Sequence, residues 1–346
     1  MPKHTTIDDR TATHPCYDGE AHQKYARLHL AVAPACNIQC HYCNRKYSCA
    51  NESRPGVVAE VLTPKQALAR VAAVKVRFPQ LTVVGIAGPG DALANPDRLI
   101  TTCSLIRDAF PELMLCLSTN GLALPAQAAR LVDLGVHHVT VTINALDPTV
   151  TARIHPWIFW EHRRRRGLEA ARILIDNQLA GLDILVAKGV AVKINSVLIP
   201  GVNDTHLPEL NEVISRRGAR IHNIVPLLSD PSFGTYHGLM GQRGPTPSEV
   251  AAVRRACRGT AIQMTHCRQC RADAVGLLGA DHHAEFSTRH PPAERCDGMG
   301  HLTVPPTFST TATMLFHAAG TLPARSTPGP FAVAGGEPRV LSPSSL

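Results

Sequence analysis

Short apolar runs alternate with longer amphipathic segments from Tyr25 to Arg258. The apolar runs are rich in β-branched residues and predict strands, whereas apolar residues recurring every three or four positions predict helices. The predicted strands cover residues 25–34, 81–88, 113–119, 137–144, 190–199 and 221–227. The predicted helices cover residues 63–78, 96–110, 125–135, 163–188, 206–218 and 248–258.

This order of elements predicts a particular class of fold. Strands that alternate with helices pair in parallel through right-handed crossovers. Six repeats are too few for the usual closed eight-stranded barrel. We therefore predict an α/β fold, a partial (β/α)6 TIM-like barrel, with a doubly wound open sheet as the alternative. In both folds ligands bind at the carboxyl ends of the strands.

The composition along the chain predicts how it divides into segments and in which cellular compartment the protein occurs. We expect a polar N-terminal extension on the surface (1–24), the barrel (25–265), a C-terminal extension (266–300) and a disordered tail rich in Pro, Ser and Ala (301–346). Hydrophobic residues make up 44%, which excludes a mostly disordered chain. The chain has neither an apolar run long enough to cross a membrane nor the apolar core of a secretory signal, so we predict a cytoplasmic protein without membrane contact.

The net charge of +8 would suit nucleic acid or an acidic partner. Much of the excess lies in one run, residues 162–166, and aromatic residues are only 4%, so we expect no nucleic-acid partner. We predict that the basic run is a solvated helix face, with contact to an acidic delivery partner as the alternative.

Eleven cysteines are the most informative feature of the composition. In a reducing cytoplasm clustered cysteines indicate metal ligands or catalytic groups before disulfides. Cys36, Cys40 and Cys43 form a CxxxCxxC motif directly after the first predicted strand. Zinc or a [4Fe-4S] cube would both accept three such thiolates. On a cube, three protein ligands would leave one iron open to a substrate or cofactor.

The motif, with an aromatic residue before its last cysteine, resembles the radical S-adenosylmethionine (SAM) superfamily. Further motifs in the same order resemble one branch of it, the maturases that build the core of the nitrogenase iron–molybdenum cofactor. The resemblance covers roughly residues 10–290. Its motifs are HPC (14–16), CNIQCHYC (36–43), ESRPGV (52–57), AGPGDAL (87–93), STNG (118–121), IHPWIFW (154–160), NSVLIPGVND (195–204), GQRGPT (241–246) and CRQCRADAVGLLG (267–279).

The resemblance implies three [4Fe-4S] clusters. Cys36, Cys40 and Cys43 would hold the first, and SAM would chelate its open iron. Two precursor clusters would use six further residues, which we divide into His29, Cys49 and Cys116 for one and Cys16, Cys267 and Cys270 for the other.

The resemblance also implies a reaction and its partners. One SAM would donate a methyl group to a precursor cluster, and a second would yield the 5′-deoxyadenosyl radical that abstracts hydrogen from it. The carbon would become a carbide as the two cubes fuse, with an added sulfur, into an eight-iron core. An iron–sulfur delivery scaffold, an electron donor and downstream cofactor carriers would be the partners.

Further residues at the strand ends are candidate SAM contacts. Gly88, Pro89, Gly90 and Asp91 follow the second strand, where the superfamily usually carries a GGE-like sequence, so GPGD is a departure. We also expect contacts from Tyr42, Asn120, Thr142, Asn144 and Ile194. Glu52 would accept protons or orient SAM, with a surface salt bridge to Arg54 as the alternative.

Several of these residues have simpler interpretations from sequence alone. A histidine on a strand is usually a hydrogen-bonded core residue, a lone Cys116 a buried hydrophobe, and a CxxC pair a zinc site. We expect Cys103 and Cys257 to be structural and leave Cys296 unassigned. The rival functions are a radical SAM enzyme acting on an organic substrate and a non-catalytic iron–sulfur scaffold.

Overall fold

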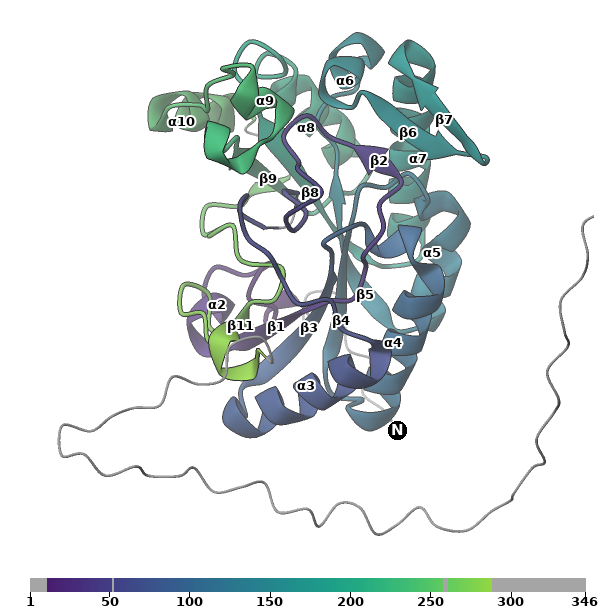
Figure 1. The fold of residues 1–346 in the computed structure, drawn as a ribbon, viewed down its shortest axis with the longest axis vertical. Helices are drawn as coiled ribbons and strands as arrows, with labels where there is room; N and C mark the ends of the chain where they lie inside the picture. The colour runs from purple at the N-terminus through teal and green to yellow at the C-terminus, as the bar shows by residue number, and fades with distance from the viewer. Residues whose placement is uncertain (1–10, 52, 258–260, 288–346) are drawn as a thin grey trace, which may run out of the picture. The chain divides into compact units, whose positions relative to one another are not determined.

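Strands that follow one another along the chain also lie side by side in one sheet (Figure 1). Six parallel strands occur in the order β1 (Ala26–Ala31), β3 (Leu81–Ala87), β4 (Met114–Thr119), β5 (Val136–Thr142), β8 (Ala191–Leu198) and β9 (Ile221–Pro226). A doubly wound sheet reverses its strand order at a switch point, and this order does not reverse. Right-handed crossovers therefore place the connecting helices on one face, and the prediction of a partial barrel is confirmed.

The computed structural model describes residues 11–51, 53–257 and 261–287. These residues belong to one unit of the chain, Met1–Ala293. Glu52, Cys296 and the tail at 301–346 lie outside the described residues, so their predictions stay predictions. No helix in the described part combines the length and apolarity that a membrane span requires.

The helices of the barrel begin where local signals place them. Thr63 and Thr246 each form a capping box with the residue three positions on, which satisfies two amide groups at a helix start. The helices after the six strands are α3 (Pro64–Arg77), α4 (Pro96–Ala109), α5 (Leu124–Asp133), α7 (Gly167–Ala187), α8 (Leu207–Arg216) and α10 (Pro247–Ala256). The shorter ones are α2 (Ala21–Lys24), α6 (Pro148–Ile154), α9 (Tyr236–Leu239), η1 (Ala92–Ala94), η2 (Pro231–Phe233) and η3 (His283–Phe286).

Each strand presents an apolar face to the helices and a more polar face to the barrel interior. Leu28 and Leu30 of β1 pack in the helix-side core, whereas Arg27 and His29 line an interior cavity. This period-two alternation repeats on the other strands. Cys116, Ser118, Thr140, Lys193, Asn195 and Asn223 are the interior residues of β4, β5, β8 and β9. The fold thus collects chemically active side chains inside the barrel.

The last residues of the barrel range and the C-terminal extension together connect the two edges of the open sheet. Strand β10 (Ile262–Gln263) pairs in parallel with β9 at one edge, and β11 (Val275–Gly276) pairs antiparallel with β1 at the other. The segment between them, 264–274, carries Cys267 and Cys270. The extension therefore brings both cysteines to the side of the barrel that six strands leave open.

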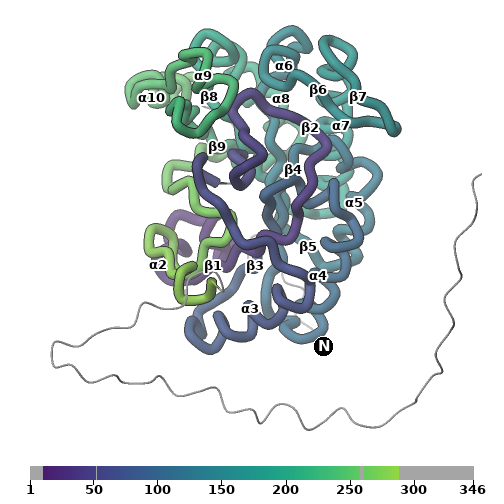
Figure 2. The backbone as a smooth tube through the Cα atoms, viewed as in Figure 1, coloured from purple at the N-terminus to yellow at the C-terminus, as the bar shows by residue number. Residues whose placement is uncertain are grey.

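The N-terminal extension is buried in part, so the prediction that it runs over the surface holds only for some of its residues. Of its described residues, 11–24, five are buried (Thr11, His14, Pro15, Tyr17 and Ala21) and five are exposed. The hydroxyl of Tyr17 donates to the carbonyls of Val139 and Ala191, at 3.1 and 3.2 Å, and so joins β5 to β8. His14 is 1% exposed and packs against His138. Figure 2 shows this purple segment beside the yellow-green C-terminal extension. The polar composition of this segment did not indicate the buried residues, because a polar group such as the Tyr17 hydroxyl forms hydrogen bonds inside the barrel.

The basic run also differs from its prediction, because it is a strand and not a helix face. Strand β7 (Arg163–Arg166) forms a hairpin with β6 (Trp157–Trp160), which in turn pairs with β2 (Ile38–Gln39). Glu161 and His162 adopt positive φ at the turn, and helix α7 begins only at Gly167. Arginine has good helix propensity, but cross-strand pairing with the aromatic strand overrides it.

Burial of histidines predicts that the fold is sensitive to acid. His222 on β9 is fully buried, with its ring nitrogens 2.9 Å from Ser196 Oγ and 3.0 Å from Asn211 Oδ1. Burial lowers the pKa of His222 from 6.5 to about 3. Between these values the unfolded chain binds a proton that the folded chain does not, so stability falls as the pH drops below 6.5.

We expect His222 to lower the free energy of unfolding by roughly 2 kcal/mol at pH 5 relative to pH 7. Urea unfolding of the apoprotein at both pH values measures this loss. His222→Gln keeps a polar group at the position but cannot titrate, so its loss between the two pH values should be smaller by that amount. An identical loss in both proteins would contradict the assignment.

Candidate iron–sulfur site

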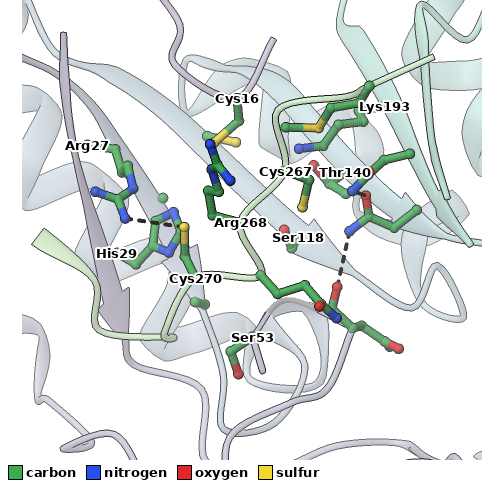
Figure 3. A pocket seen from close by; sticks show the side chains of 18 of the residues that line it. Cys16, Arg27, His29, Ser53, Ser118, Thr140, Lys193, Cys267, Arg268 and Cys270 are labelled. Atoms are coloured by element: carbon green, nitrogen blue, oxygen red, sulfur yellow. Dashed lines mark hydrogen bonds between the residues drawn. The ribbon is translucent and has the colours of Figure 1, made fainter. Parts of the chain in front are cut away.

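An interior cavity lies at the centre of the candidate site (Figure 3). Its walls come from β1, β3, β4, β5, β8 and β9 and from both extensions. Five of the six predicted precursor ligands line it, namely Cys16, His29, Cys116, Cys267 and Cys270. The sixth, Cys49, does not line it, but the next two residues in the chain, Ala50 and Asn51, do. Residues distant in sequence therefore meet around one space.

The His29 ring is held in the form that binds metals. Its Nδ1 lies 3.1 Å from the carbonyl of Arg271, which can only accept a hydrogen bond, so Nδ1 carries the proton and Nε2 keeps its lone pair. Burial lowers the pKa of His29 to about 4 and keeps the ring neutral. A Cβ atom at Gly85 would lie 3.0 Å from the Cδ2 atom of His29, so glycine on β3 leaves room for the ring.

The cavity wall is cationic. Arg27 is 1% exposed and Lys193 is 7% exposed, and no Asp or Glu is among the described residues that line the cavity. Arg27 donates from Nη2 to Cys270 Sγ at 3.2 Å and from Nη1 to the Leu277 carbonyl at 2.9 Å. Lys193 lies over the ring of Tyr17, 5.2 Å from its centroid. Buried cations without carboxylates favour an anionic occupant.

The three motif cysteines lie close together in the loop after β1. Gln39, between Cys36 and Cys40, donates from Nε2 to the carbonyls of Cys40 and Cys43, both at 2.9 Å, and so folds the loop on itself. Asn120 Nδ2 lies 3.8 Å from Cys36 Sγ. Pairing of β2 with β6 fixes the same loop to the hairpin. Burial raises the pKa of the Cys40 thiol, and the neighbouring Cys43 and Cys36 thiols raise it further.

The thiols of the motif form a donor set that fits an iron–sulfur cluster. No three His, Cys, Asp or Glu side chains in the described ranges are close enough together to hold one metal ion. Three thiolates in one loop are a donor set that a [4Fe-4S] cube accepts, with one thiolate on each of three irons. Burial raises the pKa of Cys36 to about 12, and a coordinating metal would remove that proton. The ten described cysteines form no disulfide with one another.

The Gly88–Asp91 loop contacts the chain that leads into the motif. The Gly90 amide donates to the Ala33 carbonyl at 2.6 Å, and the Asp91 amide donates to the Ala35 carbonyl at 2.8 Å. The carboxylate of Asp91 accepts from the Thr119 hydroxyl and the Asn120 amide. Asp91 is thus buried and bonded to the protein, so in this structure it positions the loops.

A substitution at Gly90 tests this close approach. A Cβ atom at this position would lie 1.8 Å from the Ala35 carbonyl oxygen, so Gly90→Ala must move the backbone that precedes Cys36. We expect a loss of stability of roughly 2 kcal/mol and a weakened triplet cluster, measured by urea unfolding and by iron content. Gly19→Ala is the matched control, because a Cβ atom there meets nothing within 4 Å. Equal behaviour of both variants would contradict the role of Gly90.

The residues predicted to contact SAM differ in their burial, in their hydrogen bonds and in the face of the sheet on which they lie. Tyr42 is 1% exposed; its hydroxyl donates to Asn51 Oδ1 at 2.7 Å and accepts from Asn144 Nδ2 at 2.8 Å. Thr142 is buried, and its carbonyl accepts from Gln178. Ile194 lies in the helix-side core, on the face of β8 opposite the cavity, so its expected packing against adenine is not supported.

Sequence reasoning missed several cavity residues. Arg27 and Lys193 were not identified, although both occupy interior positions of predicted strands. Asn195 was missed too; its Nδ2 donates to the Asn51 carbonyl at 3.1 Å and its Oδ1 accepts from Asn223. The available signal was a polar residue at every second position of otherwise apolar strands. Cys103 and Cys257 lie in the apolar core, as expected for structural residues.

Comparison with known proteins identifies the family of this chain. The profile of the Radical SAM superfamily matches residues 30–214, more than half of the chain. The chain therefore belongs to the radical SAM superfamily, whose members use a [4Fe-4S] cluster and SAM. Within it, the chain is similar to the FeMo cofactor biosynthesis protein NifB of Bradyrhizobium diazoefficiens, with 59% identity over 281 residues that cover 81% of this chain and 56% of the relative.

Two further relatives bear the same name. The chain is 58% identical to NifB of Rhodobacter capsulatus over 274 residues, which cover 79% of this chain and 61% of that protein. It is 54% identical to NifB of Azotobacter vinelandii over 283 residues, 81% of this chain and 56% of that protein. The predicted resemblance to the nitrogenase-cofactor maturases is confirmed. The chain spans somewhat more than half the length of these relatives.

Proposed function

We propose that this protein is a cytoplasmic radical SAM maturase that joins two [4Fe-4S] clusters into the eight-iron core precursor of the nitrogenase iron–molybdenum cofactor. A SAM-derived carbide and an added sulfur would complete the core. The observation that carries the proposal is the cationic cavity, in which five predicted iron ligands from distant parts of the chain meet. The similarity to NifB proteins supports the same product.

In this proposal the motif loop holds the resident cofactor. Cys36, Cys40 and Cys43 would bind three irons of one cube and leave the fourth to SAM. When bound, the cube and SAM supply a one-electron cleavage that produces an organic radical. Gln39 and the β2–β6 pairing hold the loop, and Asn120, whose Nδ2 lies 3.8 Å from Cys36 Sγ, would contact a bound ligand. Asn144 donates to the Tyr42 hydroxyl and so bonds the residues that follow β5 to the motif loop.

The two precursor cubes are substrates in this proposal, and the cavity residues hold them. His29 presents a neutral nitrogen, which binds iron more weakly than a thiolate and so releases it more readily during fusion. Arg27 and Lys193 offset the negative charge that sulfides and thiolates bring into a buried space. Closure of this space against water during the reaction would protect a carbon radical from quenching. We assign His29, Cys49 and Cys116 to one cube and Cys16, Cys267 and Cys270 to the other.

Iron and sulfide analysis under anaerobic conditions, with electron paramagnetic resonance, tests the proposal. We expect about twelve irons per chain, from three four-iron cubes, and 5′-deoxyadenosine after reduction in the presence of SAM. About four irons would support a radical SAM enzyme with an organic substrate instead. Full iron content without 5′-deoxyadenosine would support a non-catalytic scaffold.

A further inference from the structure

The β6–β7 hairpin carries an exposed cationic and aromatic surface. Cross-strand pairs place Trp157 opposite Arg166 and Phe159 opposite Arg164. Paired residues share a face, and Ile158 is fully buried, so these four side chains lie on the outer face of the hairpin. Phe159 is 50% exposed, and the guanidinium of Arg164 lies 4.6 Å from the centroid of the Trp157 ring. Tryptophan, phenylalanine and arginine are the residues enriched at protein interfaces.

The charge of the hairpin is strongly unbalanced. Four arginines stand at 163–166, against one acidic residue, Glu161, between Trp157 and Arg166. Arg165 already pairs with Glu161 and Glu169. Arg164 and Arg166 are exposed and form no ion pair within the described residues. A partner for this face therefore has an acidic surface.

The hairpin is bonded directly to the motif loop (Figure 1). Ile38 and Gln39, which lie between Cys36 and Cys40, pair with Ile158 and Trp157. The Phe159 amide donates to the Asn37 carbonyl at 2.6 Å. A protein bound to the outer face would thus contact the hairpin whose strand β6 is hydrogen-bonded to β2 of the motif loop. None of the hairpin residues lines the interior cavity, so this face does not serve the entry of precursor cubes.

We infer that the outer face of the β6–β7 hairpin is the docking surface for an acidic electron-transfer protein that reduces the motif cluster. The inference rests on the proposed function, because SAM cleavage consumes one electron per event. Electron transfer requires close approach, and the hairpin is the charged surface joined to the cluster loop. Transient redox complexes use small interfaces and depend on charge steering for their association rate.

A charge reversal tests the inference. We would measure the initial rate of 5′-deoxyadenosine formation by the reconstituted protein with two reductants: photoreduced flavodoxin, which is acidic, and photoreduced 5-deazariboflavin, which is small and needs no docking. With flavodoxin below saturation, R164E/R166E should lower the rate at least about tenfold, and added salt should lower the unaltered protein's rate. With deazaflavin the same variant should retain its rate.

Two matched variants complete the design. R130E/K188E makes the same change of charge at exposed positions on α5 and after α7, and should keep the flavodoxin-driven rate. R164Q/R166Q removes charge without reversing it and should give an intermediate loss. An unchanged flavodoxin rate in R164E/R166E, or an equal loss with both reductants, would overturn the inference. No 5′-deoxyadenosine from the unaltered protein with either reductant would overturn the proposed function as well.

Discussion

Alanine at Cys40 should abolish the reductive cleavage of SAM while most cavity iron remains bound. Cys40 is 5% exposed and lies at the centre of the motif, where Gln39 bonds the carbonyls of Cys40 and Cys43. Two thiolates cannot hold a cube that must also leave one iron to SAM. The cavity ligands come from other parts of the chain, so about two thirds of the iron should stay. The readouts are 5′-deoxyadenosine yield and iron content.

Cys270→Ala should give the reverse pattern. Cys270 lines the cavity and accepts from Arg27, far along the chain from the motif. Cleavage of SAM should survive, whereas the cavity should lose iron and no eight-iron core should form. Cys103→Ala is the control for loss of any buried thiol, because Cys103 packs in the apolar core within α4. Equal loss of iron and activity in the Cys40 and Cys270 variants would mean that the two sites are not independent.

Methionine at Lys193 should weaken binding of the precursor cubes at least about tenfold and at the same time stabilise the apoprotein. Lys193 is 7% exposed and lies over the Tyr17 ring. Methionine has a similar length and removes a buried cation, which should raise the free energy of unfolding by about 1 kcal/mol. The same change removes the charge that offsets an anionic occupant.

Iron titration followed by electron paramagnetic resonance measures the first effect, and urea unfolding of the apoprotein measures the second. Lys188→Met is the control, since Lys188 is exposed at the end of α7 and should change neither quantity. A variant that is both less stable and normally loaded would show that Lys193 serves the fold and not the occupant.

Local sequence was sufficient for much of the barrel and for the motif. The alternation of side-chain direction along β1 assigned Leu28 and Leu30 to one face of the strand and His29 to the other. Capping residues such as Thr63 indicated where helices begin. The CxxxCxxC motif was visible because its three cysteines lie within eight consecutive residues. Such features depend on neighbours in the chain, which sequence displays directly.

The errors have a common origin in contacts between distant residues. The bonds of Tyr17 to Val139 and Ala191 join residues more than 120 positions apart, so part of a polar segment that looked exposed is buried. The arginine run favours helix locally, but pairing with Trp157 and Phe159 makes it a strand. Ile194 shares strand β8 with cavity residues, but its side chain points to the helices. Successive side chains on a strand point to opposite faces of the sheet, so a shift of one position changes the face.

By itself, the sequence determined the superfamily, the parallel barrel and the cysteines available for iron, because these follow from short-range pattern and residue chemistry. Only the tertiary structure decided that His29, Cys116 and the two extensions meet around one space, and that Arg27 and Lys193 make it cationic. The strength of an electrostatic interaction depends on the distance between the charges in space and on their burial. The order of residues along the chain gives neither quantity.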